Sequence, residues 1–220
     1  MLSRILEPEL MDTAEEAGDY DAMDHGEVNR RFVEDLLAFG ELNGDVLDLG
    51  TGTAQIPIEL CQQNADCRVM AVDAAVAMLD VARVNLEIAG LTMRVQLDRA
   101  DAKDLPYEDE MFGAVMSNSI VHHIPEPASV LSEAVRVLGP GGTLFFRDLL
   151  RPQSDGDLQT LVETYAAGES DHARQMFSDS LRAALTLDEM RELASAVGIP
   201  PDAFTQTSDR HWTLAWVKSA

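Results

Sequence analysis

The stretch 46–60 constrains the fold of this chain more than any other. It begins with a short apolar run that contains one acid, continues with two glycines one residue apart, and ends in a segment with apolar residues at helical spacing. Such a pattern predicts a strand, a tight turn and a helix. Gly50 and Gly52 allow backbone angles that other residues avoid, so a ligand can approach the main chain near the free N–H groups of the helix start. The stretch therefore predicts a nucleotide-type ligand site.

Asp48 narrows the kind of ligand. It lies in the apolar run just before the glycines, where a carboxylate would repel a pyrophosphate. We therefore expect a ligand that brings hydrogen-bond donors or positive charge to this position. An NAD(P)-dependent oxidoreductase on a similar sheet is the main alternative. It is disfavoured by Asp48 and by Gln55, which stands where the dinucleotide fingerprint has a third glycine.

Strands and helices alternate after this stretch, which predicts a parallel sheet with right-handed crossovers. A helix at Thr186 with the spacing of a capping box and a hairpin follow near the end of the chain. The prediction is an α/β fold: a doubly wound, Rossmann-like, seven-stranded sheet with an antiparallel terminal strand. The predicted strands are 46–49, 68–73, 93–97, 112–117, 143–147, 204–207 and 211–217, and the predicted helices of the core are 54–63, 75–89 and 128–138.

Two helical segments flank this core, and we expect one domain over 1–220. Residues 1–40 interleave acids with large apolar residues, which predicts a helical lid, and 44–147 form the cofactor-binding core. Residues 148–185 have helical patterns without a strand, so they predict an insertion over the carboxyl ends of the strands, where open sheets bind ligands. Residues 186–220 form the terminal helix and hairpin.

The charge excludes several partners. Against 39 acidic residues stand only 16 basic ones, a formal net charge of -23, which disfavours nucleic acid and anionic membranes. There is no apolar run near the roughly 18 residues of a membrane span, and the acidic N-terminus is unlike a signal peptide. We expect a cytoplasmic protein with no membrane or nucleic-acid partner. The oligomeric state stays open, with a homodimer among the options.

Cys61 and Cys67 are the only cysteines. They flank a predicted helix end with no histidine nearby to complete a metal site, so we expect two reduced structural thiols. The sequence predicts no metal centre.

Five motifs follow one another at regular positions along the core: 48–52, Asp73, Asp101 with Ala102, the strand 112–117 followed by 121–123, and 135–143. Together they resemble those of class I S-adenosylmethionine-dependent methyltransferases of the small-molecule type. The resemblance covers about residues 28–147 and implies a Rossmann-like sheet with an added antiparallel strand. One departure is Ala54, where the family often has a third glycine.

The resemblance implies S-adenosylmethionine as cofactor, whose ammonium and sulfonium are compatible with Asp48. Asp73 would accept from the ribose hydroxyls and Asp101 from the adenine amino group, while the Ala102 N–H would serve a ring nitrogen. Both aspartates have an alternative role as helix N-caps. The implied cofactor-binding residues are Tyr20, Asp48, Gly50, Thr51, Gly52, Asp73, Ala74, Asp101, Ala102, Ser117 and Asn118.

The acceptor side is less constrained. Methyl transfer is an in-line displacement that needs positioning more than a covalent nucleophile. His122 and His123 are candidate general bases, with a plain loop feature as the alternative. Residues 117–120 lack the two prolines that mark enzymes acting on nucleobase amines, so a small-molecule acceptor is expected, and a non-catalytic cofactor-binding module remains open. The candidate substrate-binding residues are His25, Arg147, Asp148, Tyr165 and Arg174. Arg147 and Asp148 end the fifth strand and would face the crevice, whereas Arg174 of the insertion could instead form a surface ion pair.

Overall fold

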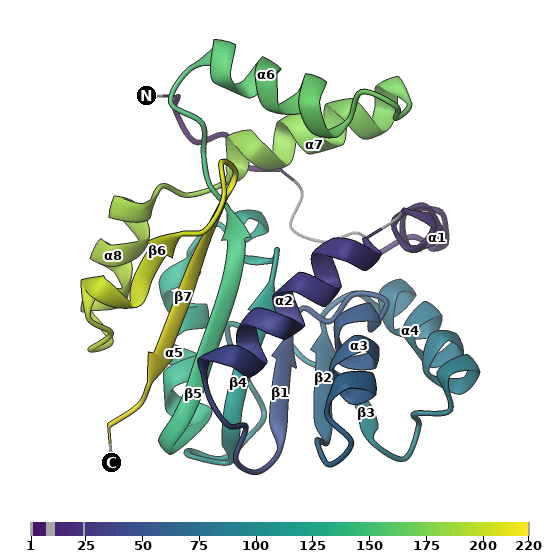
Figure 1. Ribbon diagram of the computed structural model, residues 1–220, viewed down its shortest axis with the longest axis vertical. Helices are drawn as coiled ribbons and strands as arrows, with labels where there is room; N and C mark the ends of the chain where they lie inside the picture. The colour runs from purple at the N-terminus through teal and green to yellow at the C-terminus, as the bar shows by residue number, and fades with distance from the viewer. Residues whose placement is uncertain (1, 8–11, 24, 220) are drawn as a thin grey trace.

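One seven-stranded sheet with helices on both faces organises the molecule (Figure 1). The computed structural model describes residues 2–7, 12–23 and 25–219. The strand order is β3-β2-β1-β4-β5-β7-β6, and β7 runs antiparallel to both of its neighbours, which confirms the predicted fold class. The strands are β1 Val46–Leu49, β2 Val69–Asp73, β3 Val95–Arg99, β4 Phe112–Asn118, β5 Leu138–Leu149, β6 Phe204–Gln206 and β7 His211–Val217.

The order of the strands reverses at β1, which determines where a ligand can bind. β1 pairs in parallel with β2 on one side and with β4 on the other. Leu49, the last residue of β1, is in register with Val72 and Ser117, so the three strands end at the same level. Because the crossovers leave β1 in opposite directions, a crevice opens at this edge of the sheet.

Helices cover the two faces with separate apolar cores. The helices α2, α3 and α4 pack Phe32, Leu60 and Leu86 onto one face, and α5 and α8 pack Val130 and Met190 onto the other. Since both faces are covered, every residue of β1 is buried. The helix bounds are α2 Gly26–Phe39, α3 Gln55–Gln63, α4 Val76–Ala89, α5 Pro127–Val137 and α8 Leu187–Ser195.

The hairpin and the capping box lie where the sequence predicts them, whereas two strands differ. The side chains of Thr186 and Glu189 each bond the other's backbone N–H, as expected of a capping box. β3 starts two residues after its predicted start, because the chain turns at 92–94 first. The predicted strand 143–147 is the middle of the longer β5, since residues 138–142 pair with the β4 start and with Lys218 rather than forming a plain turn.

Three further helices lie above the carboxyl ends of the strands (Figure 1). α6 Asp155–Tyr165 and α7 Asp171–Ala183 form a pair, as predicted for the insertion, and α1 Ala14–Ala22 lies beside α4. Residues 2–7, which we call the N-terminal strap, run in extended conformation beneath α7, where the Ile5 N–H donates to the Arg182 carbonyl oxygen. The parts of the predicted lid at residues 1, 8–11 and 24 lie outside the described residues. Short 3-10 turns are formed by Val121–His123 and Pro201–Ala203.

In the part of the chain that the structure describes, no helix combines the length and the apolar character needed to cross a bilayer.

Candidate functional site

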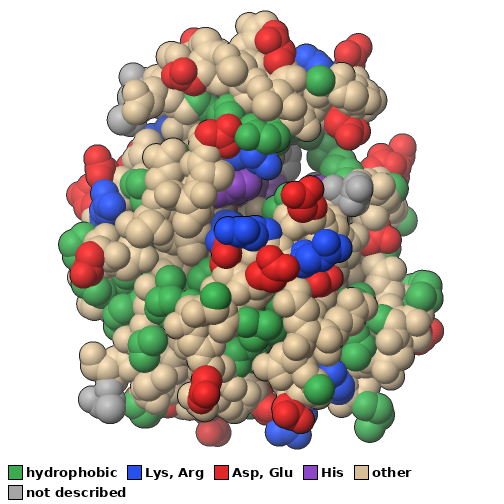
Figure 2. Space-filling model, in the orientation of Figure 1, with side chains coloured by type: hydrophobic (Ala, Val, Ile, Leu, Met, Phe, Trp, Pro, Cys, Tyr) green, Lys and Arg blue, Asp and Glu red, His purple; other side chains and the backbone are tan. Residues whose placement is uncertain are grey.

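A cavity of about 890 Å³ opens at the crevice between the sheet and the upper helices. Its volume lies within the range of small-molecule and cofactor sites. Figure 2 shows the hollow below the α6 and α7 pair, with histidine surface inside it. The predicted residues that line it are Tyr20, His25, Gly50, Gly52, Asp73, Ala74, Asp101, Ala102, Asn118, His122, His123 and Tyr165.

The glycine loop forms the floor of the cavity. Gly50 has a φ of +68°, and a Cβ atom placed on it would lie 2.0 Å from Ile120 Cγ2. Both the backbone angle and the space therefore require glycine. The Thr51 N–H donates to the Val72 carbonyl oxygen at 2.9 Å, which fixes the loop to β2, and Thr51 itself is buried behind it.

The Asp73 carboxylate joins two loops at the end of β2. Its Oδ2 accepts from the Gly52 N–H and its Oδ1 from the Ala75 N–H, each at 2.9 Å. Burial raises the pKa of Asp73 above its ordinary value, although these amides oppose the shift. The bond to Ala75, which precedes α4, fits the capping alternative in part. A carboxylate oxygen has two acceptor sites, so each oxygen of this cavity-lining group can still accept from a ligand.

Asp101 and Ala102 line the cavity one strand further along the sheet. The Asp101 carboxylate accepts from the Lys103 N–H at 2.9 Å and lies 3.1 Å from Lys103 Nζ. The chain makes a turn at 101–104 and no helix follows, so Asp101 closes this turn rather than capping a helix.

Acids surround the glycine loop and make this end of the cavity negative. Asp48 is buried behind the loop. Its burial, together with repulsion from Asp73, raises its pKa to about 7, although Thr51 opposes this shift. Burial and the charges of Asp73 and Asp48 raise the pKa of Tyr20 to about 12. A cation placed here would offset the cost of these buried charges.

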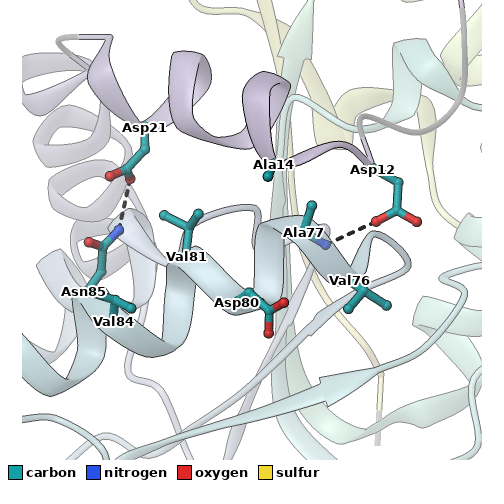
Figure 3. A pocket seen from close by; sticks show the side chains of 9 residues that line it. All are labelled: Asp12, Ala14, Asp21, Val76, Ala77, Asp80, Val81, Val84 and Asn85. Atoms are coloured by element: carbon teal, nitrogen blue, oxygen red, sulfur yellow. Dashed lines mark hydrogen bonds between the residues drawn. The ribbon is translucent and has the colours of Figure 1, made fainter.

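Helix α1 covers the cavity beside the glycine loop. Tyr20 and His25 line it, with their ring centroids 5.1 Å apart. Asp21 Oδ1 holds the helix in place by accepting from Asn85 Nδ2 at 2.8 Å and from Gln55 Nε2 at 3.0 Å. Figure 3 shows the outer side of this contact, a groove between α1 and α4 crossed by the Asp21–Asn85 hydrogen bond.

Ser117 and Asn118 end β4 and differ in their surroundings. Ser117 is buried, and its hydroxyl donates to the Leu49 carbonyl oxygen at 2.9 Å, which ties β4 to β1. Asn118 lines the cavity. Ser119 follows with a φ of +61°, a strained conformation for a residue other than glycine, at the turn that leads to the histidines.

Asp148 at the end of β5 orients His122 and the turn that carries both histidines. Its Oδ1 lies 2.5 Å from His122 Nδ1, and its Oδ2 accepts from the Val121 N–H at 2.6 Å. Burial lowers the pKa of His122, but the Asp148 and Glu7 carboxylates outweigh it and hold the pKa above its ordinary value. Asp148 is buried and outside the cavity lining, so it reaches the cavity only through His122.

The other candidate substrate residues divide into two groups. Tyr165 lines the cavity and donates to Asp209 Oδ2 at 2.7 Å. Arg147, expected to face the crevice, is instead buried outside the cavity lining and pairs with Asp35 at 2.8 Å. Arg174 is also outside the lining and donates to the Ala166 carbonyl oxygen at 3.2 Å.

Glu7 is a cavity-lining residue that the sequence analysis missed. Its Oε1 lies 3.0 Å from His123 Nδ1 and 3.5 Å from His122 Nε2. In the sequence Glu7 is one of many acids in an acidic segment, so no local signal separates it from its neighbours.

Comparisons with known proteins agree with this architecture. The family described as "Methyltransferase domain" matches residues 47–146. A 27-O-demethylrifamycin SV methyltransferase from Amycolatopsis mediterranei is 27% identical over 175 residues, which are 80% of this chain and 60% of the relative. A ubiquinone/menaquinone biosynthesis C-methyltransferase from Vibrio cholerae is 26% identical over 161 residues, 73% of this chain and 59% of the relative. The chain spans about half the length of the curated relatives it matches.

Among solved structures, one from Methanococcus maripaludis has a TM-score of 0.73 at 18% identity and covers 98% of both chains. That protein is described provisionally as an S-adenosyl-L-methionine-dependent methyltransferase. At this identity the likeness concerns the fold.

Proposed function

We propose that the chain is a class I S-adenosylmethionine-dependent methyltransferase, whose domain it matches over residues 47–146, and that it transfers the methyl group of S-adenosylmethionine to a small molecule. The observation that carries this proposal is the acidic surround of the glycine loop. Asp48, Asp73 and Tyr20 gather at the loop, and the charges that shift the pKa values of Asp48 and Tyr20 all come from aspartates. This environment suits a ligand with an ammonium and a sulfonium and opposes a pyrophosphate.

The cofactor would lie across the ends of β1, β2 and β3. Gly50 and Gly52 would approach its methionyl part, with the Asp48 carboxylate behind the loop. Asp73 would accept from the ribose hydroxyls with the acceptor sites that its two backbone bonds leave open. Asp101 and Ala102, one strand further, would hold the adenine.

The acceptor would enter from the side of α6, α7 and the N-terminal strap. The two curated relatives carry the names of a rifamycin and of quinones as their substrates, and we infer a small organic molecule here as well. The chemistry is an in-line displacement, in which the acceptor atom bonds to the methyl carbon while the carbon–sulfur bond breaks. Positioning provides most of the rate enhancement. The general-base role of His122 and His123 stays a prediction, tested by replacing each with asparagine once an acceptor is known.

Calorimetric titration tests the proposal. We expect S-adenosylmethionine and its demethylated product to bind with one site per chain and NAD to give no heat of binding. Tight binding of NAD with none of S-adenosylmethionine would refute the proposal in favour of an oxidoreductase. Binding without transfer in a screen of labelled cofactor against metabolites would favour the non-catalytic module.

The affinity for S-adenosylmethionine should depend on pH through Asp48. In the free protein burial raises the pKa of this group to about 7, so it is largely protonated at pH 6 and ionised at pH 8. Only the ionised form attracts the cationic ligand. We expect the affinity to rise about twofold to fivefold from pH 6 to pH 8, which corresponds to a fall of about half to one unit in this pKa on binding. Calorimetry across this range checks it.

The Asp48→Asn variant is the control for this pH dependence. The affinity of this variant for S-adenosylmethionine should change less between pH 6 and pH 8, because position 48 no longer titrates. Asp73 and Tyr20 remain as the other titratable groups that face the loop. The pKa of Asp48 is higher in the folded protein than in the unfolded chain, so ionisation of this group destabilises the fold. The free energy of unfolding therefore falls as the pH rises from about 4 to about 7. The variant should therefore be more stable than the wild type at pH 8. An unchanged pH profile of affinity would remove Asp48 from the cofactor site.

Release of α1 should weaken cofactor binding. Asp21→Ala removes the acceptor for Asn85 and Gln55. The closed position of α1 over the ligand would then lose about 1 kcal/mol of hydrogen-bond stabilisation. The dissociation constant of S-adenosylmethionine should therefore rise about fivefold to tenfold. Glu15→Ala, an exposed position on the same helix, is the matched control and should bind as the wild type does. Equal affinities for both variants would show that α1 does not cover the bound cofactor.

A further inference from the structure

Three donor atoms converge at the acceptor end of the cavity. They belong to Glu7, His122 and His123, whose ligand atoms all lie within 4.8 Å of one another. Glu7 Oε1 is 3.5 Å from His122 Nε2 and 3.0 Å from His123 Nδ1. For a tetrahedral zinc ion with bonds of 2.0 to 2.2 Å, the ligand atoms are separated by about 3.4 Å. The two distances from the glutamate oxygen are therefore close to those within a metal-ligand set.

Two of these atoms are buried without a hydrogen bond. Among the described residues, neither Glu7 Oε1 nor His123 Nδ1 has a hydrogen-bond partner, although the two lie 3.0 Å apart. Buried polar atoms in folded proteins are generally satisfied, and an exception needs an explanation. A cation bound to both atoms would satisfy both at once.

The other polar side-chain atoms of His122 and Glu7 are already engaged, which directs His122 Nε2 and Glu7 Oε1 toward the ligand position. Asp148 Oδ1 lies beside His122 Nδ1, so the Nε2 of the same ring faces Glu7. A carboxylate that orients a histidine in this way is the usual second partner of a metal-binding imidazole. Glu7 Oε2 accepts from the Ser180 hydroxyl at 3.2 Å, which leaves Oε1 toward the histidines.

Arg4 fixes the strap that carries Glu7. Its guanidinium donates to the carbonyl oxygens of Ala183 at 2.7 Å, Ile124 at 2.9 Å and His122 at 3.2 Å. These bonds connect the strap to both the histidine turn and the end of α7. The glutamate is therefore held against the histidines by contacts that involve none of the three donor atoms.

We propose that Glu7, His122 and His123 bind a divalent transition-metal ion, with zinc as the best fit, and leave one coordination position open to the cavity. Two imidazole nitrogens and one carboxylate oxygen suit zinc, whereas calcium and magnesium prefer oxygen ligands alone. All three side chains line the cavity, so a fourth ligand can reach the ion from there. The inference concerns metal binding and does not depend on the proposed methyl transfer. A histidine bound to metal through these atoms would not act as the general base.

Metal titration of the full chain tests the proposal. After treatment with a chelator, the protein is titrated with Zn²⁺ by calorimetry and with Co²⁺ by visible absorption, which reports tetrahedral coordination. We expect one ion per chain. Glu7→Gln and His123→Asn should each weaken binding at least about tenfold, since even the loss of a group that only hydrogen-bonds to a metal ligand costs about 10- to 100-fold. Circular dichroism and thermal melting verify that both variants are folded.

Three more variants sharpen the result. His172→Asn and Glu16→Gln replace cavity-lining residues outside the cluster and should bind Zn²⁺ as the wild type does. Arg4→Gln keeps all three ligands but loosens the strap, so it should weaken binding by an intermediate amount. The proposal is overturned if the wild type binds no ion at millimolar Zn²⁺, or if Glu7→Gln and His123→Asn bind as tightly as the controls. In the first case the cluster is an ion pair between the strap and the histidines.

Discussion

Replacing Asp73 by alanine is expected to raise the dissociation constant of S-adenosylmethionine about 10- to 100-fold. A hydrogen bond to a charged acceptor contributes about 1.5 to 3 kcal/mol, and each 1.4 kcal/mol is a factor of ten. The structure adds a second cost, because the same carboxylate accepts from the Gly52 and Ala75 amides. The substitution would therefore loosen the glycine loop and the start of α4 as well as remove the ribose acceptor.

Two measurements separate these effects. The melting temperature of Asp73→Ala reports the loss of the two backbone bonds, while calorimetry reports the affinity. Asp80→Ala, which removes an exposed acid on α4 that pairs with Arg83, is the control and should change neither by much. If the melting temperature of Asp73→Ala falls and the affinity stays unchanged, Asp73 is a structural link and the ribose lies elsewhere.

Replacing Gly50 by alanine is expected to destabilise the protein by about 2 to 5 kcal/mol. The φ of +68° costs an L-residue about 1 to 2 kcal/mol. The new Cβ would meet Ile120 Cγ2 at 2.0 Å, and such overpacking adds about 1 to 3 kcal/mol. For a chain of this size the melting temperature should fall by roughly 5 to 15 °C. Cofactor binding should weaken too, since the loop must shift to accommodate the methyl group.

Gly90 provides a matched comparison for Gly50. It has a similar φ of +70° at the end of α4, but a Cβ there would meet no atom within 4 Å. Gly90→Ala should therefore show the backbone cost alone. The double variant Gly50→Ala with Ile120→Ala should recover part of the difference. Equal losses for Gly50→Ala and Gly90→Ala would mean that Ile120 does not restrict the loop.

The sequence predicted those residues of the cavity lining that directly follow a strand. The glycine loop, Asp73, and Asp101 with Ala102 each follow a strand whose apolar pattern is visible locally, and the topology of an open sheet then brings the strand ends together. The capping box at Thr186 was equally local.

Contacts between distant segments could not be predicted in this way. Arg147 was expected to face the cavity because it ends β5, but its side chain pairs with Asp35 of α2 instead. Asp148 was expected to contact substrate, whereas its carboxylate is taken up by His122 and the turn at Val121. Glu7 reaches the histidines because Arg4, Ile5 and Glu7 itself attach the strap to the histidine turn and to α7. Each of these partners is set by tertiary packing, which periodicity and spacing do not encode.

The attachment of the strap beneath α7 also orders the assembly of the cavity during synthesis. Chains fold from the N-terminus as they leave the ribosome, and β1 to β4 with the glycine loop and Asp101 are complete by residue 118. The strap is synthesised before α7 but cannot be fixed until its partners at Arg182 and Ala183 have emerged. Glu7 can therefore reach the histidines only after nearly the whole length from β1 to α7 has been made, so the acceptor side of the cavity is completed late.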